Sequence, residues 1–267
     1  MLLVIAIGSS NIRIGLYEGQ KLRMQTSMRV DTQILPDEYA AKLRAALGLF
    51  GYRGEEVEGA ILSSVMPPLT FGIRQAVERL CHVRPLVVGP GLKTGLAIRI
   101  NDPAQLGSDL VTQAVAAREK EKGPSVVCSL GTATTFLLLD GQGAVRGASI
   151  APGMQISLAA LAQHTASLPW IDLETPPPAA LGKTTVDSMK SGLLLGTACL
   201  VEGMTQRLEE EAGEAVSLLL TGTFAPLIAP LCRRKCRIEP DLALEGLRLL
   251  YERHRAAGRK KGEEKAK

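Results

Sequence analysis

The chain contains one strand–turn–strand pattern twice. Residues 2–17 read LLVIAIGSSNIRIGLY, and residues 126–139 read VVCSLGTATTFLLL. In each copy an apolar run ends at a glycine and a hydroxyl-rich turn, and a second apolar run follows. Superposing Gly8 on Gly131 places Ala6 on Ser129. The repetition predicts two similar halves, which excludes most single-sheet folds.

The segments after each copy also repeat, as alternating strands and helices. In the first half we expect a third strand over residues 21–27, helices over 36–50, 69–81 and 108–121, and strands over 59–63 and 85–88. In the second half we expect three strands from Ser125, helices over 155–165 and 186–208, a strand over 215–220 and a closing helix. Antiparallel strands followed by crossover helices differ from a simple Rossmann sheet. The sequence therefore predicts a duplicated α/β fold with mixed sheets and two βββαβαβα-type halves.

The domain boundaries follow from this repetition. We expect an N-terminal half over residues 1–122, a C-terminal half over 123–253, and a flexible tail over 254–267. The tail reads HRAAGRKKGEEKAK, a basic run that includes two glutamates. Such a run is typical of a solvated end, and a binding tail is the alternative.

Composition narrows the class of protein. The net charge of +4 is too small and dispersed to predict nucleic-acid binding, and no apolar run approaches the roughly 20 residues that span a bilayer. Five scattered cysteines suit reduced thiols in a cytoplasmic protein. Cys232 and Cys236, in CRRKC, have no second cysteine pair to complete a zinc site.

Seven ordered segments carry a more specific resemblance. They are IGSSNIRIGLYEG, SSVMPPLT, GPGLKTGLAIRINDPAQLGSD, SLGTATTF, APGMQISLAALAQHTASLP, GKTTVDSMKSG and DLALEGLRLLYER. From Met1 to about Arg253 the chain resembles the type III pantothenate kinases, the first enzymes of coenzyme A synthesis in many bacteria. The resemblance implies the duplicated ribonuclease H-like fold of the actin-like ATPases. It also implies a cytoplasmic dimer that uses ATP, Mg²⁺ and a monovalent cation such as K⁺ to phosphorylate pantothenate.

The resemblance also locates three acids, of which this chain keeps one. The family aspartate two residues before the first-turn glycine, which holds the metal and phosphate group, is Ala6 here, and the second acid is Ser129. The acid implied as the base is retained as Asp109. Alanine cannot coordinate a metal and neutral serine is a poor ligand for Mg²⁺, so we expect no metal site and weak activity of the isolated chain.

Positions that the resemblance assigns to the substrate have changed as well. The family arginine after the base is Leu110, and the family tyrosine of the IRY segment is Ile100. Both changes replace a polar contact by an apolar one. By contrast Gly107 is retained, and Thr185 matches the family threonine that reaches across the dimer into the partner's pantothenate pocket.

Both phosphate turns keep small and hydroxyl-bearing residues. The resemblance assigns phosphate binding to Gly8, Ser10, Asn11, Gly131, Thr132 and Thr134. Such residues let backbone amides approach an anion. The threonines of GTATT are also compatible with ordinary turn and strand positions.

Other residues keep an alternative structural interpretation. Asp109 suits the first turn of a helix, and Thr185 suits a helix N-cap. Lys93 and Arg99 are read as solvated loop cations in preference to phosphate ligands, and Lys183 stays undecided.

Three functions follow from these residues. The first is a catalytically deficient pantothenate-kinase-like subunit that pairs with an active paralogue and completes its pocket through Thr185. The second is an active homodimeric kinase that relies on Asp109. The third is a non-enzymatic regulator that keeps the fold for ligand sensing or protein interaction.

Overall fold

The computed structural model describes residues 1–177 and 179–265, and it divides into two compact units. The first unit contains residues 1–96 and 102–116 and the chain from Leu242 onward. The second contains residues 97–101 and 117–241. Each unit is built on one five-stranded sheet. No helix of the described chain is long and apolar enough to cross a membrane.

The first sheet has the order β3-β2-β1-β4-β5. Its strands are β1 (Leu2–Ile7), β2 (Asn11–Glu18), β3 (Lys21–Arg29), β4 (Gly59–Ser64) and β5 (Leu86–Val87). The three N-terminal strands run antiparallel, whereas β4 and β5 join in parallel. The sheet is therefore mixed, as the sequence predicted.

Helices cover both faces of this sheet. Leu3, Ile5 and Ile7 point into a core shared with α1 (Pro36–Gly48) and α2 (Pro67–Cys81). On the other face Leu244 of α8 (Leu242–Lys265) lies against Gly15, beside Val4. The alternating strand pattern places Ala6 on this second face, two residues closer to the turn than Val4.

The second sheet repeats the first, with the order β8-β7-β6-β9-β10. Its strands are β6 (Ser125–Leu130), β7 (Ala133–Leu139), β8 (Val145–Pro152), β9 (Ser217–Thr221) and β10 (Arg237–Ile238). Substituting β6 to β10 for β1 to β5 gives the same order and the same pattern of directions. The predicted duplication is confirmed, and β1 and β6 end one residue before Gly8 and Gly131.

The α-helices of the second unit lie in the chain between β8 and β10. They are α4 (Met154–His164), α5 (Thr185–Lys190), α6 (Gly196–Ala212) and the short α7 (Ala225–Ile228). Where the sequence predicts one helix over residues 186–208, the structure has α5, a π-helical turn at Ser191–Leu195, and α6. The helix pattern alone does not reveal such a wide turn, because its hydrophobic spacing changes by only one residue.

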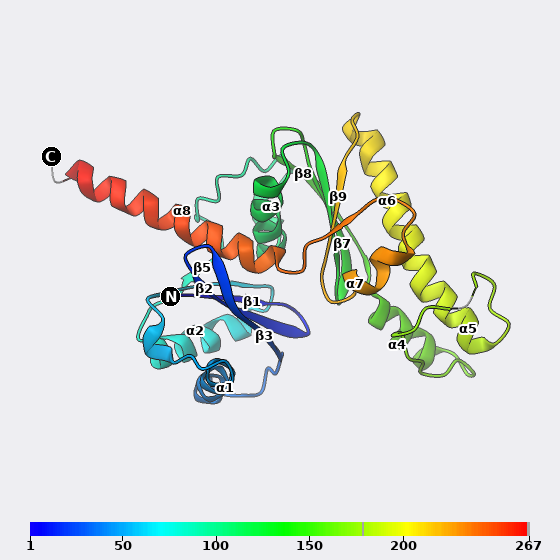
Figure 1. Cartoon of the computed structure of the whole chain (residues 1–267), viewed down its shortest axis with the longest axis horizontal. Helices are drawn as coiled ribbons and strands as arrows, with labels where there is room; N and C mark the ends of the chain where they lie inside the picture. The colour runs from blue at the N-terminus through cyan, green and yellow to red at the C-terminus, as the bar shows by residue number, and fades with distance from the viewer. Residues whose placement is uncertain (178, 266–267) are drawn as a thin grey trace. The chain divides into compact units, whose positions relative to one another are not determined.

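The C-terminal helix corrects two boundaries of the sequence analysis. Residues 242–253 were expected in the C-terminal half, but α8 belongs to the first unit, where Leu244, Leu247 and Leu250 are fully buried. Residues 254–267 were expected to form a flexible tail, but α8 continues to Lys265, shown in red in Figure 1. Alanines, lysines and glutamates favour helix, which explains why the basic run extends the preceding helix.

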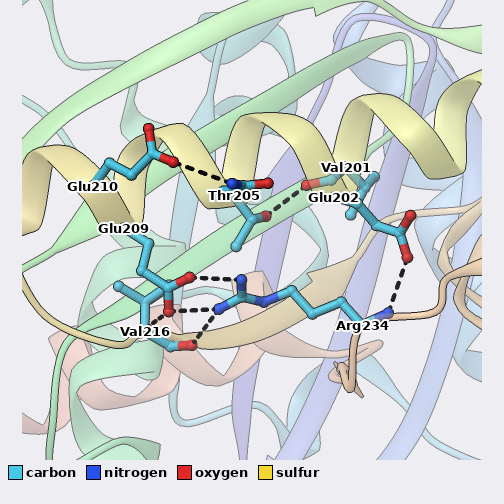
Figure 2. A network of polar contacts seen from close by, with 8 residues as sticks. Val201, Glu202, Thr205, Glu209, Glu210, Val216 and Arg234 are labelled. Carbon is cyan, nitrogen blue, oxygen red and sulfur yellow. Dashed lines mark hydrogen bonds and ion pairs between the residues drawn. The ribbon is translucent and has the colours of Figure 1, made fainter.

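A polar network fixes the end of α6 to the loop before β10 (Figure 2). The guanidinium of Arg234 donates two hydrogen bonds to the carboxylate of Glu209, at 2.7 and 2.8 Å, and one to the carbonyl oxygen of Val216 at 3.1 Å. The backbone N–H of Arg234 donates to Glu202 at 2.9 Å. The bonds from Arg234 and from the Val216 amide lower the pKa of Glu209 to about 2.

Candidate phosphate turns and residual base

The first turn is closed by three backbone hydrogen bonds. The N–H of Gly8 donates to the carbonyl oxygen of Asn11 at 2.9 Å, and the carbonyl oxygen of Ser10 accepts from Val30 at 3.0 Å. The carbonyl oxygen of Ile7 accepts from Val65, also at 3.0 Å. The predicted residues Gly8, Ser10 and Asn11 are therefore brought together at one end of the sheet.

Ala6 lies between two side chains on neighbouring strands. Arg13 of β2 is its antiparallel partner, and Ser63 of β4 is its parallel partner. Residues paired in this way project from the same face of a sheet. The acid position of the first turn is thus occupied by a methyl group, with a cation on one side and a buried hydroxyl on the other.

Asp109 lies in the first turn of α3 (Ser108–Lys120), which begins next to the end of β4. The hydroxyl of Ser108 donates to the carbonyl oxygen of Ser64 at 2.9 Å and accepts from the Ser64 N–H at 3.1 Å. A Cβ on Gly107 would lie 2.5 Å from Oδ1 of Asp109, so a larger residue at position 107 would require the carboxyl group to move. Burial raises the pKa of Asp109, which hydrogen bonds from backbone N–H groups partly offset.

Three carbonyl oxygens in and beside the second turn accept hydrogen bonds from backbone N–H groups. The carbonyl oxygen of Leu130 accepts from Phe224, that of Thr132 from Gly153, and that of Ala133 from Gly131, each at 3.1 Å. A Cβ on Gly153 would lie 2.2 Å from the carbonyl oxygen of Gly131. This close approach requires glycine and holds the turn against the end of β8.

Hydroxyl groups surround the second acid position. Ser129 pairs with Thr135 on β7 and with Thr221 on β9, so three hydroxyl-bearing side chains form a row on one face. Thr134 pairs with Leu130 instead and is 2% exposed, which places it on the opposite face from Ser129. The structure brings Gly131, Thr132 and Ser129 together but directs Thr134 away from them.

Neither acid position fits the Mg²⁺ ion that the family pattern implies. Mg²⁺ is held through carboxylates, phosphate oxygens and water, and the two positions offer a methyl group and a hydroxyl. Among the described residues, no group of three or more histidines, cysteines or acids lies close enough to hold a metal ion. No step through a bound metal is therefore derived for this chain.

Thr185 is the first residue of α5 and is exposed. The N-cap is Thr184, whose hydroxyl accepts from the Asp187 N–H at 3.1 Å, so the N-cap interpretation of Thr185 is wrong by one residue. Thr185 and Lys183 line an open hollow of about 630 Å³ whose apolar wall includes Met189 and Leu193. The threonine is thus accessible from outside its own unit.

The remaining candidates differ in burial and in bonding. Arg99 donates to the buried carboxylate of Asp140 at 3.0 Å, so it is an ion-paired residue, whereas Lys93 is exposed. Ile100 belongs to the segment 97–101 of the second unit and is half-buried. Leu110 is buried in the first unit, 6% exposed.

Sequence reasoning missed the neighbours of the acid positions. Strand register places Arg13 and Ser63 beside Ala6, and Thr221 beside Ser129. A single sequence does not give the register of β4 and β9, because these strands pair with distant segments. The antiparallel partner Arg13 could have been found, because a short turn fixes the register of the strands it joins. No sequence pattern indicated the pair of hydrogen bonds between Ser64 and Ser108.

The fold and the two turns define the class of protein. Two ribonuclease H-like sheets with matching order, each with a glycine turn after its first strand, are the architecture of actin-like ATPases and sugar kinases. Within that class the chain belongs to the type III pantothenate kinase family, whose sequence model matches residues 2–207.

Individual relatives cover nearly the whole chain. A type III pantothenate kinase from Exiguobacterium sp. is 41% identical over 254 residues, covering 95% of this chain and 99% of the relative. One from Pelobacter propionicus is 40% identical over 256 residues, covering 96% and 100%. These matches show the family, as the motifs predicted.

Solved structures with low identity support the fold alone. A Campylobacter jejuni protein described as a Baf family transcriptional activator has a TM-score of 0.60 at 15% identity, covering 95% of this chain and 99% of that one. A Sinorhizobium meliloti protein described as a 2-dehydro-3-deoxygalactonokinase has a TM-score of 0.59 at 14% identity, covering 96% and 99%.

Proposed function

We propose that this chain takes part in the ATP-dependent phosphorylation of pantothenate, the activity for which its relatives are named. In this proposal the chain is a catalytically deficient subunit. An active paralogue with all three family acids supplies the complete site, and the two chains form a hetero-oligomer.

The observation that carries the proposal is the methyl group of Ala6 at the end of β1. Phosphoryl transfer depends on positioning and on stabilising negative charge, and little else is required of the protein. Loss of one charge-stabilising group commonly costs a factor of about 10² to 10³ in rate, on the analogy of oxyanion holes. Ser129 removes the second acid, and the two losses belong to one catalytic unit.

The exposed Thr185 supports the heteromeric part of the proposal. It lies on the surface of the second unit, beside an open hollow, and does not cap its own helix. A threonine in that position is available to a partner chain. Thr185 is retained, whereas the family acids at positions 6 and 129 are replaced by alanine and serine, and this contrast favours a role of Thr185 in the partner's site.

The test compares the purified chain with the same chain co-expressed with a paralogue carrying the Asp-x-Gly turn. We expect no pantothenate phosphorylation by the single chain, and activity in the complex that exceeds that of the paralogue alone. Thr185→Val in this chain should lower the activity of the complex, and Thr184→Val serves as the neighbouring control. Full activity of the purified single chain would refute the proposal.

A second candidate, an active homodimer that uses Asp109, is favoured by the surroundings of that carboxyl group. Asp109 is held beside Gly107, close to the end of β4, and its raised pKa suits a group that accepts a proton. If the single chain is active, Asp109→Ala should lower its kcat by about 10² or more. An unchanged rate would exclude this mechanism.

A further inference from the structure

Two cysteines of the second unit are neighbours in space. Cys232 follows the 3₁₀ turn at Ala229–Leu231, and Cys236 comes directly before β10. Sγ of Cys232 lies 3.5 Å from the carbonyl oxygen of Ile228, and Sγ of Cys236 lies 3.9 Å from that of Ala229, the next residue. A hydrogen bond also joins the two thiol groups to each other. The folded chain therefore holds these thiols as a pair.

The loop between the two cysteines is fixed by bonds to the rest of the second unit. The carboxylate of Glu202 on α6 accepts hydrogen bonds from the backbone N–H groups of Arg233 and Arg234, the latter at 2.9 Å. The guanidinium of Arg234 binds Glu209 and the carbonyl oxygen of Val216 (Figure 2). Because these bonds hold the residues between the cysteines, a sulfur–sulfur bond can close with little change of the backbone.

Other thiols nearby do not complete a metal site with this pair. Cys128 of β6 belongs to the same core cluster, and Cys199 of α6 is an exposed neighbour of Cys232. Across the described part of the chain, no three cysteines, histidines or acids are placed to hold one metal ion. The chemistry that remains for two adjacent thiols is oxidation to one disulfide.

The surroundings of the pair allow this reaction and make it slow. Cys232 and Cys236 are partly exposed, whereas Cys81 and Cys128 are buried. Burial, together with the neighbouring Cys236 and Glu202, raises the pKa of Cys232 to about 12, and burial raises the pKa of Cys236. The thiolate is the attacking species, so exchange is slow at neutral pH and faster in alkali.

We propose that Cys232 and Cys236 form a reversible intramolecular disulfide by exchange with a small organic disulfide. One thiolate of the pair attacks a sulfur of the reagent, which forms a mixed disulfide and releases one reagent thiol. The other cysteine then attacks the protein sulfur of the mixed disulfide and releases the second reagent thiol. The pair is oxidised, the reagent is reduced to two thiols, and the two cysteine protons pass to the released thiolates. Neither step involves nucleotide or pantothenate, so the proposal does not depend on the proposed function.

The experiment is incubation of the full chain with oxidised glutathione under native conditions in mild alkali. The reaction is stopped with acid, and the disulfides are located by mass spectrometry of proteolytic peptides. We expect a bond between Cys232 and Cys236 without glutathione on either residue, and its complete loss after dithiothreitol. A parent chain in which both thiols stay free, or in which either one bonds to Cys128 or Cys199, would overturn the inference.

The variants test whether the two thiols react as a pair. At least one of Cys232→Ser and Cys236→Ser should retain glutathione on its remaining cysteine, about tenfold or more above the parent, because no second thiol displaces it. Cys199→Ser removes the exposed neighbour and is the matched control, so it should form the same bond as the parent. Equal retention of glutathione at these positions by the parent and both variants would contradict the pairing. The peptide map of the parent needs no substitution, so it decides the outcome even if a variant fails to fold.

Discussion

Asp109 is a largely buried carboxyl group in the first turn of α3. Burial raises its pKa above the usual carboxyl value, so the folded chain holds a proton there more tightly than the unfolded chain. Its contribution to stability is therefore present at acidic pH and is lost as the pH rises through the pKa of the folded state. Asp109→Asn removes the charge, so we expect it to raise the free energy of unfolding at neutral pH.

The measurement is urea unfolding of the parent and Asp109→Asn between pH 3 and pH 8. The difference should be largest at the neutral end and should shrink as the pH falls to the ordinary carboxyl range near 4. Asp102→Asn, an exposed N-cap of a short 3₁₀ turn, is the control for a generic change of charge. A pH-independent difference would show that Asp109 is not destabilised by burial.

At the scale of elements, the network at the end of α6 should give a pH dependence of stability opposite to that of Asp109. The pKa of Glu209 is lowered to about 2, so its contribution is present above the usual value near 4.5 and is lost as the pH falls through 2. Glu209→Gln should lower the free energy of unfolding near neutral pH by about 1 kcal/mol, since it removes a charge-assisted pair. Chemical denaturation as a function of pH measures this.

The adjacent Glu210→Gln is the matched control for that network. Among the described residues, Glu210 accepts only from Gln206 in the same helix, at 3.1 Å, and it lies on the surface. Its substitution should change the free energy of unfolding by less than about 0.5 kcal/mol. Equal effects of the two substitutions would mean that Arg234 does not stabilise the loop.

The turn between β6 and β7 gives another test at this scale. Gly153→Ala would push a methyl group against the carbonyl oxygens of Gly131 and Thr132, neither of which can move without opening the turn. We expect a loss of about 1 to 3 kcal/mol in stability, measured by thermal unfolding. Gly147→Ala, on the preceding strand β8 and facing open space, should cost far less. A tolerated Gly153→Ala would show that the turn is not rigid.

Local pattern explains which elements the sequence predicted. The strands that end at Gly8 and Gly131 follow from apolar runs and turn residues that are adjacent in the chain. The cap at Thr184, one residue before the expected Thr185, depends on backbone angles that two consecutive threonines do not distinguish. The neighbours of Ala6 and Ser129 on β4 and β9 come from pairings across distant segments, which periodicity does not encode.

For the whole molecule, the last helix shows that the two compact units do not correspond to the two halves of the sequence. α8 is the final element, yet it packs on the first sheet, with Leu244 against Gly15 and Tyr251 over Gly59. Leu244, Leu247 and Leu250 of this helix are fully buried. An amphipathic pattern reveals that a helix has a buried face but not which sheet covers it. The first unit is therefore assembled from both ends of the sequence.

This division predicts how truncations behave. A chain that ends at Arg253 keeps the buried leucines of α8. It loses residues 254–258, whose side chains are exposed, so it should unfold with nearly the parent's free energy.

Leu247→Ala in the full chain should lower the free energy of unfolding by about 2 to 5 kcal/mol, because it leaves a cavity in the core of the first unit. Hydrogen exchange should then show lost protection in β1, β2 and β4 before β6, β7 and β9. Equal loss of protection in both sheets would mean that the two units unfold as one.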